Sequence, residues 1–416
     1  MTGAVVNPST RYENKLLLVL FLSFGFVFFD RQALSFLAPM IREDFPLSNA
    51  QLGTLSGVLA LTWALSGLVA GRLSDRLGRR KPVLIAAVVL FSVFSAASGL
   101  MTGFTGLLVA RALMGVAEGA VLPMAQSLMV EASQPHRRGL NMGLVQGSSA
   151  GLLGGILAPV VVVVTAEHLG WRTAFYLTIV PGLLLAAWIA HSVREVPPGG
   201  ATAPATTGSD GGRRSFAPVL RERNILLCMA IAVCYLTWFI VIITFTPTYL
   251  TEVKGFSPGT MSTIMTCFGV AWVLWGFLTP GISDRIGRRR TMIVFTVVAA
   301  VCPLAVVFVA QPALLGAIVV VTYTGLGCFT LFMATIPAET VPARSLATAL
   351  GLVMGIGELC GGFVAPILAG WASDRWGLQI AMFTAAGGAA LVVLLSFGLR
   401  ETAPLVLRRR AERVTV

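Results

Sequence analysis

Long apolar runs separated by short polar stretches dominate the chain. Uncharged runs lie at 45–71, 82–110, 139–166, 224–251, 255–283 and 376–399. Each is longer than the about 20 residues that an α-helix needs to cross a bilayer. A further run, 291–338, is long enough for two crossings and is broken near Gln311 and Pro312. This pattern predicts a set of membrane-spanning helices.

Twelve spans are predicted once the segments with isolated charges are added. They are 15–38, 50–71, 82–102, 104–130, 138–165, 171–191, 224–250, 259–281, 291–310, 312–338, 344–370 and 376–399. The first span follows Lys15 and resembles a signal-peptide core, but its removal would leave eleven spans and destroy the repeat described below. We therefore expect an all-α membrane protein with twelve transmembrane helices.

The composition supports this prediction. Hydrophobic residues make up 56% of the 416 residues and charged residues 12%, with a mean hydropathy of +0.85. A soluble domain with an ordinary surface is far less apolar. The six Cys residues all fall in predicted spans without the spacing of a metal site, so we interpret them as small hydrophobic residues. Neither a metal nor a cofactor is expected.

The net charge of +12 would suit a nucleic-acid partner, but the position of the charges excludes this interpretation. All but six of the 30 Lys and Arg residues fall in the N-terminus, the C-terminus and alternate loops on one side. The six are Arg42, Arg172, Lys254 and Arg375 on the other side, and Arg31 and Arg111 inside spans. Because positive loops face the cytoplasm, both termini are predicted to be cytoplasmic. We expect a multi-pass protein of a bacterial inner membrane in contact with anionic lipid.

Two sequence motifs recur at nearly the same spacing. The segment GGILAP, 154–159, returns as GGFVAP at 361–366, and DRLGRRK, 75–81, returns as DRIGRRR at 284–290, with offsets of 207 and 209 residues. The repeat predicts a six-span unit used twice. The expected divisions are an N-terminal half 1–192, a cytoplasmic linker 193–223 rich in Pro, Gly and Arg, and a C-terminal half 224–416. Paired repeats of this kind are typical of secondary transporters.

The segment GRLSDRLGRRK, 71–81, lies between spans 2 and 3, and its copy GISDRIGRRR, 281–290, lies between spans 8 and 9. With these motifs the chain resembles the major facilitator superfamily over essentially its whole length, which implies the major facilitator fold. An ordinary positive loop would explain the arginines but not the spaced Gly and Asp. We expect a conformational gate of charge pairs that form in one state and break in another, made of Gly71, Asp75, Arg76, Gly78, Arg79, Asp284 and Arg285.

Five ionisable residues lie well inside predicted spans: Asp30, Arg31, Arg111, Glu118 and Glu358. Each costs about 2.5 to 3.5 kcal/mol near the centre of a spanning helix, so such residues mark a transport pathway or a proton relay. Arg111 and Glu118 are seven residues apart, which places them within about 20° of one helix face. The alternative is a structural ion pair that only holds spans 1 and 4 together.

The successive Asp30 and Arg31 project about 100° apart, so they cannot share one direction. One arrangement sends Asp30 toward the face of Arg111 and Glu118, and Arg31 into a cavity. An arginine keeps its proton and binds a carboxylate with its planar fork, which makes Arg31 the candidate anion ligand. A desolvated carboxyl group can take up a proton near neutral pH, which makes Asp30 and Glu118 the candidate proton carriers.

Asp30-Arg31, Leu34-Ser35 and Pro39, taken with Arg111 and Glu118, resemble the anion:cation symporter group of this superfamily. The resemblance implies proton-coupled uptake of a small organic anion such as a sugar acid or aromatic carboxylate. It also implies that Asp30 and Glu118 are the protonatable pair, that Arg31 binds the substrate carboxylate, and that Gln146 contacts the substrate. Arg111 and Trp63 are further candidates for substrate binding.

Two positions depart from that group. Phe28 and Trp63 stand where the group usually has Tyr, which favours a flatter or more apolar carboxylate than a sugar acid. Charges like those of spans 1 and 4 also occur in the Spinster-like group, so a transporter of lysolipid or another amphiphile is the alternative. A drug/proton antiporter is a further alternative, disfavoured because Leu152 follows Gly151 where antiporters have a Gly-Pro step.

Four further residues are candidates for the substrate cavity. Tyr235 and Trp238, one turn apart in span 7, and Tyr323 in span 10 are expected to face it in this fold. Tyr235 and Trp238 lie too deep for an interfacial aromatic belt. Glu358 lies between glycines near the centre of span 11. It is a substrate contact, a third proton site, or an acid bonded to backbone at a loosened turn.

No phosphate-binding loop, zinc-type spacing or nucleophile elbow occurs in the sequence, so no enzyme is expected. Transport would then use ion gradients by alternating access. We expect a monomer, the usual state of the family it resembles.

Overall fold

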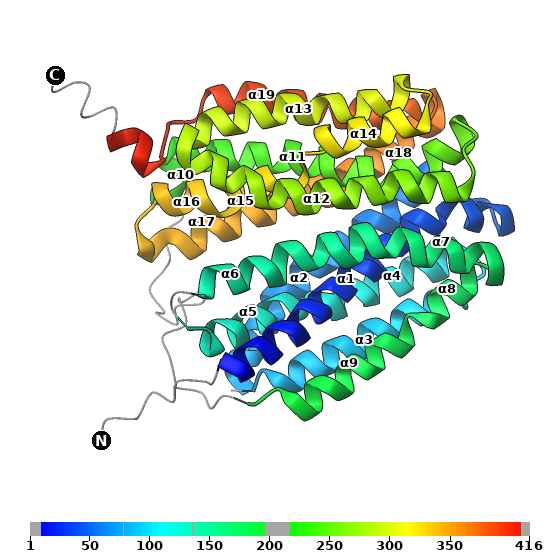
Figure 1. Ribbon diagram of the computed structural model, residues 1–416, viewed down its shortest axis with the longest axis horizontal. Coiled ribbons are helices and arrows are strands. Elements are labelled where there is room, and N and C mark those ends of the chain that lie inside the picture. Colours follow the sequence, from blue (N-terminus) through cyan, green and yellow to red (C-terminus); the bar gives the residue numbers. More distant parts are fainter. Residues whose placement is uncertain (1–9, 78, 135–136, 196–216, 409–416) are drawn as a thin grey trace.

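The computed structural model describes residues 10–77, 79–134, 137–195 and 217–408, without the side chains at 68, 71–77, 139, 217–218, 325–326, 343–344 and 347. Within these ranges the chain forms helices and no strand. Both ends of the described chain lie at the same end of a long helical bundle (Figure 1). We call this end of the bundle the termini end.

Six crossings form the N-terminal half. Their helices are α1 (Thr10–Asp44), α2 (Asn49–Leu77), α3 (Lys81–Ser98), α4 (Phe104–Glu118), α5 (Val121–Ala132), α6 (Arg138–Gly143), α7 (Ala158–Leu169), α8 (Trp171–Leu177) and α9 (Ile179–Ser192). Between α6 and α7 the fifth crossing is π-helical, in η1 (Leu144–Ser148) and η2 (Ala150–Leu157). The fourth crossing is α4 continued by α5, and the sixth is α8 continued by α9.

The C-terminal half repeats this plan. Its helices are α10 (Ala217–Arg221), α11 (Arg223–Thr248), α12 (Pro258–Ile286), α13 (Arg288–Phe308), α14 (Pro312–Thr322), α15 (Gly325–Thr330), α16 (Ile336–Thr340), α17 (Ala343–Ile356), α18 (Ala365–Trp376) and α19 (Gln379–Phe397). Its π-helices are η3 (Tyr249–Val253), η4 (Leu331–Thr335) and η5 (Gly357–Val364). Thus η5 interrupts the eleventh crossing as η1 and η2 interrupt the fifth.

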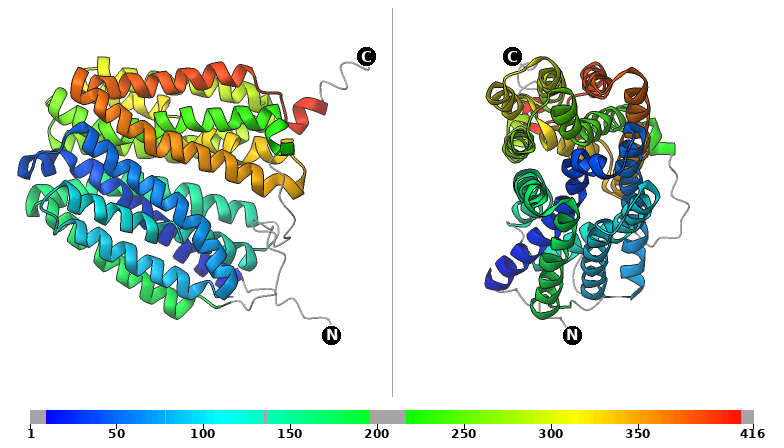
Figure 2. Two further views of the ribbon diagram at one scale, coloured as in Figure 1. Left: turned by 180° about the vertical axis from the view of Figure 1, so that it is seen from behind. Right: turned by 90° about the vertical axis from the view of Figure 1, so that its right-hand side faces the viewer.

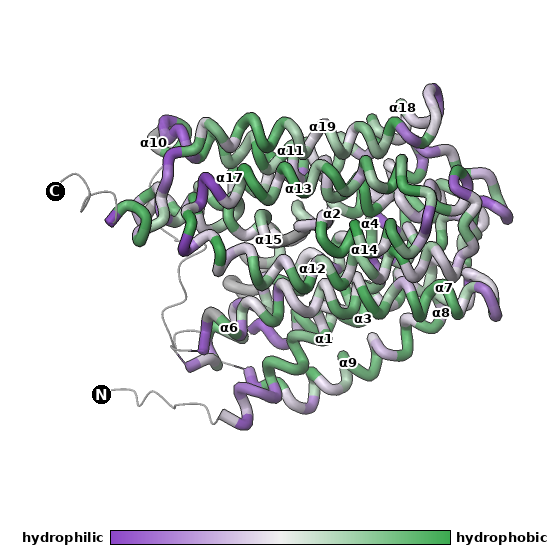
Figure 3. The backbone as a smooth tube through the Cα atoms, turned by 45° about the horizontal axis from the view of Figure 1, so that its top comes forward, coloured by the Kyte–Doolittle hydropathy of each residue, from purple (hydrophilic) through white to green (hydrophobic). Residues whose placement is uncertain are grey.

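Eleven helical segments of the described chain are long and apolar enough to cross a membrane. The remaining predicted crossing is α2, a helix of 29 residues in which the side chains at 68 and 71–77 are not described. Hydrophobic positions cover the body of the bundle and hydrophilic ones gather at its two ends (Figure 3). The predicted class, an all-α membrane protein of twelve crossings in two six-helix repeats, is confirmed.

Glycines with positive φ separate helices at equivalent places of the repeat. Gly170 (φ 83°) lies between α7 and α8, and Gly377 (φ 90°) lies 207 residues later between α18 and α19. Glycine adopts this left-handed backbone region without the Cβ clash that other residues suffer. The predicted linker, 193–223, lies largely outside the described residues, so the division into halves at that segment stays a prediction.

The two halves lie side by side (Figures 1 and 2) and meet closely at the end of the bundle opposite the termini end. There α2 packs through glycines on η5 and α18: a Cβ atom on Gly57 would come within 2.7 Å of the Phe363 carbonyl oxygen of η5, and Gly53 faces the Pro366 carbonyl group of α18. The Asp374 carboxylate of α18 accepts hydrogen bonds from the backbone N–H groups of Asn49 (2.7 Å) and Ala50 (2.9 Å) at the start of α2.

A second polar contact joins the halves at the same end. The Arg42 guanidinium of α1 donates to both carboxylate oxygens of Glu252 in η3 at 3.0 Å, and to Asn49 at 2.8 Å. We call the contacts of Asp374 and Arg42 the latch. At the termini end, by contrast, the ion pairs of the described chain stay within one half, as in Arg288 with Glu339 at 2.9 Å. The halves are therefore closed at one end only.

Candidate functional site

A cavity of about 470 Å³ lies between the two halves. Residues of α1, α2, η1 and the α4 arginine line it from the N-terminal half, and residues of α11, α12, η4 and η5 line it from the C-terminal half. Leu140 of α6 and Thr335 of η4 also line the cavity, which therefore extends to segments near the termini end. Its wall is mostly apolar, with a few polar groups, a composition typical of small-molecule sites.

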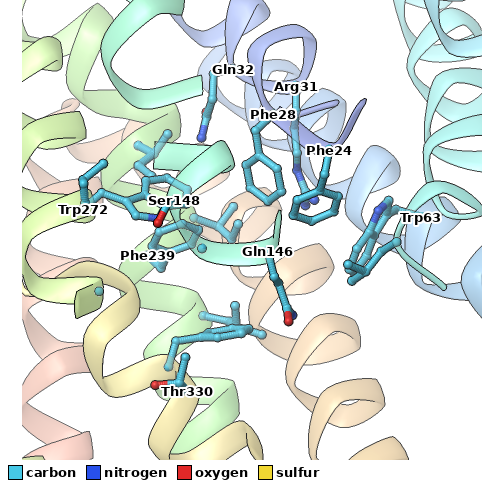
Figure 4. A pocket seen from close by; sticks show the side chains of 18 of the residues that line it. Phe24, Phe28, Arg31, Gln32, Trp63, Gln146, Ser148, Phe239, Trp272 and Thr330 are labelled. Carbon is cyan, nitrogen blue, oxygen red and sulfur yellow. The ribbon is translucent and has the colours of Figure 1, made fainter. Parts of the chain in front are cut away.

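Arg31 of α1 is the cation most available to a ligand in this wall. Its guanidinium lies over the rings of Phe28 (5.8 Å to the centroid) and Trp63 (5.5 Å). Figure 4 shows it beside Phe24, Phe28 and Trp63. Within the described chain it forms neither an ion pair nor a side-chain hydrogen bond, although it is half-buried. The rings stabilise the Arg31 charge by cation–π contacts, and its N–H groups remain available to donate hydrogen bonds to an anion.

Asp30 points away from the cavity and is buried, with 1% of its surface exposed. Its carboxyl group is hydrogen-bonded to Ser95 of α3, and the Ser95 hydroxyl oxygen in turn accepts a hydrogen bond from Thr178 at 3.0 Å. The second oxygen, Oδ1, has no partner. The divergence of Asp30 and Arg31 follows from their adjacent places on one helix.

Arg111 and Glu118 of α4 lie behind the cavity wall. Arg111 touches the cavity but is 1% exposed, and it reaches the Arg31 carbonyl oxygen at 3.4 Å and the Asp30 carbonyl oxygen at 3.5 Å. Its Nε and second terminal nitrogen have no partner. Glu118 is fully buried, does not line the cavity, and has no hydrogen-bond partner at either oxygen.

Close contact between α4 and α2 brings these charges together. A Cβ atom on Gly115 would come within 2.6 Å of the Leu59 carbonyl oxygen, and Gly119 faces the Trp63 backbone just as closely. Only glycine permits this approach, because any side chain would push the two helices apart. The two glycines thus carry Glu118 to the level of Trp63 and Arg31.

The charges of α1 and α4 form one electrostatic cluster. Arg111 interacts with Glu118, Asp30 and Arg31, and Glu118 interacts with the same two α1 residues. Yet no ion pair of 4 Å or less joins any of these four side chains, all of which lie in the described part of the chain. A set of close charges without fixed partners can exchange a proton or accept a ligand more readily than a closed salt bridge.

Glu358 and Gln146 line the cavity from the two π-helical crossings, η5 and η1. Glu358 is 6% exposed, has an unpartnered Oε2, and interacts electrostatically with Arg31 across the two halves. Gln146 accepts a weak hydrogen bond from Gln126 at 3.4 Å. π-Helical turns are frequent at functional sites because the wider turn re-aims its side chains. The residue spacing in the sequence did not predict these π-helical turns.

Three aromatic residues complete the wall, of which Phe28 was singled out by the sequence whereas Phe239 and Trp272 were not. Phe28 packs edge to face on Trp272 of α12 at 5.7 Å, and Trp272 packs on Phe239 of α11 at 5.1 Å. The N-terminal half thus meets the C-terminal half through rings just beside Arg31 (Figure 4). For Phe239 and Trp272 the only signal was their place in apolar spans, which dozens of other residues share.

Tyr235, Trp238 and Tyr323 do not line this cavity, contrary to the expectation from their depth. All three are fully buried inside the C-terminal half. Trp238 stacks on Tyr323 at 5.2 Å and donates its indole N–H to the Ala299 carbonyl oxygen of α13 at 3.1 Å. Depth in the membrane does not determine which face of a helix meets the cavity, and these side chains pack on Ala299 of α13, Phe268 of α12 and Phe332 of η4 instead.

The predicted gate is described only in part. Gly78 lies outside the described residues, as do the side chains of Gly71, Asp75 and Arg76, and Arg79 is exposed. In the second copy, Asp284 pairs with Arg288 at 2.6 Å, and Arg285 is exposed. Among the residues that the structure describes, no group of three or more His, Cys, Asp or Glu side chains could hold a metal ion.

The model of the Major Facilitator Superfamily matches residues 20–366. The chain belongs to this superfamily. It is therefore a membrane transport protein and not an enzyme.

Its relatives include transporters of organic acids. It is 30% identical to a probable 4-methylmuconolactone transporter of Cupriavidus pinatubonensis over 86% of this chain and 83% of the relative. It is 26% identical to a hexuronate transporter of Bacillus subtilis over 95% of this chain and 96% of the relative. Among solved structures, a bacterial homolog of the human lysosomal transporter Spinster matches with a TM-score of 0.76 and 20% identity, covering 94% of this chain and 97% of that one.

Proposed function

We propose that this protein is a proton-coupled symporter of a small organic carboxylate that works by alternating access. The observation that carries the proposal is Arg31, a guanidinium without an ion pair in the wall of a central cavity, with two buried carboxyl groups directly behind it. Its fork suits a carboxylate, and the aromatic rings around it suit a flat or partly apolar body. The relatives named for organic acids support this substrate class.

Charge balance provides the coupling to protons. With every group ionised, Asp30, Glu118 and Glu358 together with Arg31 and Arg111 would sum to one negative charge in the empty site. A bound monoanion would add a second negative charge inside a medium where ions are costly. Proton uptake by Asp30 and Glu118 relieves this cost, so substrate and protons bind together. If one net positive charge moves per cycle, the membrane potential contributes about 2.3 kcal/mol per 100 mV.

The latch provides the alternation. Closed contacts at Asp374 and Arg42, together with a cavity whose lining reaches the segments near the termini end, correspond to one of two access states. Rocking the halves about the cavity would break the latch and close the other end, where the predicted gate of Asp75 and Asp284 lies. We place both termini in the cytoplasm of a bacterial inner membrane by the positive-inside rule, and we infer a functional monomer built of halves 1–192 and 224–416.

An amphiphile is the second candidate substrate. The mostly apolar wall around a single available guanidinium also fits a lysophospholipid, whose phosphate would take the place of a carboxylate. The two candidates differ in ligand size and headgroup. A thermal-shift screen of the purified protein with benzoate, glucuronate and a lysophospholipid separates them, because a ligand at 100 times its Kd adds about 2.7 kcal/mol of apparent stability.

The test of coupling is uptake of the best carboxylate into liposomes with an imposed proton gradient. Asp30→Asn and Glu118→Gln should still bind and exchange labelled for unlabelled substrate but lose accumulation driven by the gradient. Arg31→Ala should lose binding itself. Glu167→Gln removes an exposed carboxylate at the end of α7 and serves as the control, which should accumulate substrate like the wild type. Accumulation with wild-type pH dependence in both carboxamide variants would refute the proton-carrier assignment.

A further inference from the structure

A second cavity, of about 510 Å³, lies in the C-terminal half at the termini end of the bundle. It forms where α11 and α13 begin and where α19 ends. Three arginines line it, Arg223, Arg289 and Arg400, with Phe397, Gly398, Leu399 and Glu401 completing the wall. It is separate from the central cavity, with which it shares no residue.

The single acid of this wall does not neutralise the arginines. The Glu401 carboxylate caps the start of α13 by accepting the N–H groups of Arg288 (2.7 Å) and Arg289 (3.3 Å), and it also accepts the Ala403 N–H at 3.0 Å. Within the described chain, the side chains of Arg223, Arg289 and Arg400 form no ion pair and no hydrogen bond to another side chain. The Nε atom of Arg289 is even buried without a partner. Three positive groups therefore converge on a cavity without a counter-charge of their own.

The equivalent helix ends of the N-terminal half have the same glutamate cap but different side chains beside it. Glu195 caps α3 by accepting the Arg80 N–H at 2.7 Å, as Glu401 caps α13. The Tyr12 hydroxyl accepts the Arg194 N–H at 3.0 Å, and the Arg194 guanidinium lies over the Tyr12 ring at 4.9 Å.

In the C-terminal half the Arg400 N–H donates a hydrogen bond to Asn224 Oδ1 at 2.9 Å instead. A short amide thus replaces a ring at the equivalent place, and the cavity lies beside it. The repeat thus makes the two helix ends alike in their backbone contacts but different in the side chains beside them.

We propose that this cavity binds the phosphate group of an anionic phospholipid. Guanidinium groups bind phosphate through paired, charge-assisted hydrogen bonds, and basic pockets at the ends of membrane helices suit anionic headgroups. The apolar neighbours point to a lipid and not to a free phosphate ion. Phe397 of α19 is 54% exposed and Leu226, one turn beyond Arg223 in α11, is 47% exposed, so acyl chains could cover both below the headgroup. The inference is independent of the transported substrate.

The test uses the purified full-length protein and compares phosphatidylglycerol with phosphatidylcholine, counted as bound lipid by native mass spectrometry. The wild type should bind phosphatidylglycerol preferentially, and rising salt should weaken the preference. The triple variant Arg223→Gln, Arg289→Gln, Arg400→Gln should bind phosphatidylglycerol on the order of 100-fold more weakly, since each arginine near a membrane surface contributes several-fold. The control triple variant Arg11→Gln, Lys81→Gln, Arg194→Gln removes the same charge from the N-terminal half. It should weaken phosphatidylglycerol binding only a few-fold.

Equal losses in the two triple variants would overturn the proposal, because they would show general attraction to a basic surface. Equal binding of the two lipids by the wild type would overturn it as well, and this arm needs no variant that must fold. A third arm adds inorganic phosphate alone. Displacement of the lipid by millimolar phosphate would identify a soluble anion site in place of a lipid site, whereas no displacement supports the lipid.

Discussion

Asp374 holds the start of α2 against α18, and its removal should shift the balance between the two access states. Its carboxylate accepts two backbone N–H bonds, from Asn49 at 2.7 Å and Ala50 at 2.9 Å. These donors belong to the first turn of a helix, where N–H groups have no partner within the helix and where the helix dipole favours a negative charge. Because donor and acceptor belong to different halves, the bonds exist only while this end is closed.

The size of the effect follows from these two bonds. Loss of a capping side chain costs about 0.5 to 2 kcal/mol, and a charge at a helix N-terminus contributes about 0.3 to 1 kcal/mol at exposed sites. Since Asp374 is exposed, we take about 1 to 2 kcal/mol for Asp374→Ala. That corresponds to about a 5- to 30-fold change in the ratio of the two states.

Spin-label distances measure this ratio directly. Labels on unnatural amino acids at 167 in α7 and 379 in α19 report on the latch end, since both positions are exposed there and belong to opposite halves. This labelling leaves the six native cysteines in place. The wild type should show a dominant short distance. In Asp374→Ala the ratio of long to short distances should rise about 5- to 30-fold.

Asp44→Ala is the matched control. Asp44 lies at the same end and accepts a hydrogen bond from the Trp171 indole at 2.9 Å and pairs with Arg172, but all three belong to the N-terminal half. Loss of the Asp44 carboxylate removes the same charge without removing a contact between the two halves, so the spin-label distances should stay as in the wild type. If Asp374→Ala also leaves them unchanged, or if both variants shift them equally, the latch does not set the access state.

Two further predictions concern the central site. Gly115→Ala should destabilise the protein by about 1 to 3 kcal/mol, because its Cβ would meet the Leu59 carbonyl oxygen at 2.6 Å, whereas Gly355→Ala, with open space around it, should be neutral in the same thermal unfolding assay. An equal effect of the two would show that the α2–α4 contact is not tight. Phe28→Tyr adds a hydroxyl beside Arg31 and should strengthen binding of glucuronate relative to benzoate by about 5-fold, the value of one neutral hydrogen bond; an unchanged ratio would show that this ring does not meet the substrate.

The sequence by itself determined the class and plan of this protein. Apolar runs of spanning length can be satisfied only in a bilayer, and the recurrence of GGILAP as GGFVAP indicated two copies of one unit. It also singled out the charges of α1, α4 and η5, because a charge inside a spanning helix is expensive and therefore conspicuous. The successive positions of Asp30 and Arg31 even required that they diverge.

The tertiary structure decided which of these groups meet the cavity. Hydropathy and helical spacing are local, so they do not say which neighbour a helix face will touch. Packing placed Arg31 in the wall and Glu118 behind it, and it buried Tyr235 and Trp238 inside one half. The latch between Asp374 and α2 likewise depends on a contact between segments more than 100 residues apart in the chain. Such contacts are set by the fit of two halves, each of which the sequence describes only one helix at a time.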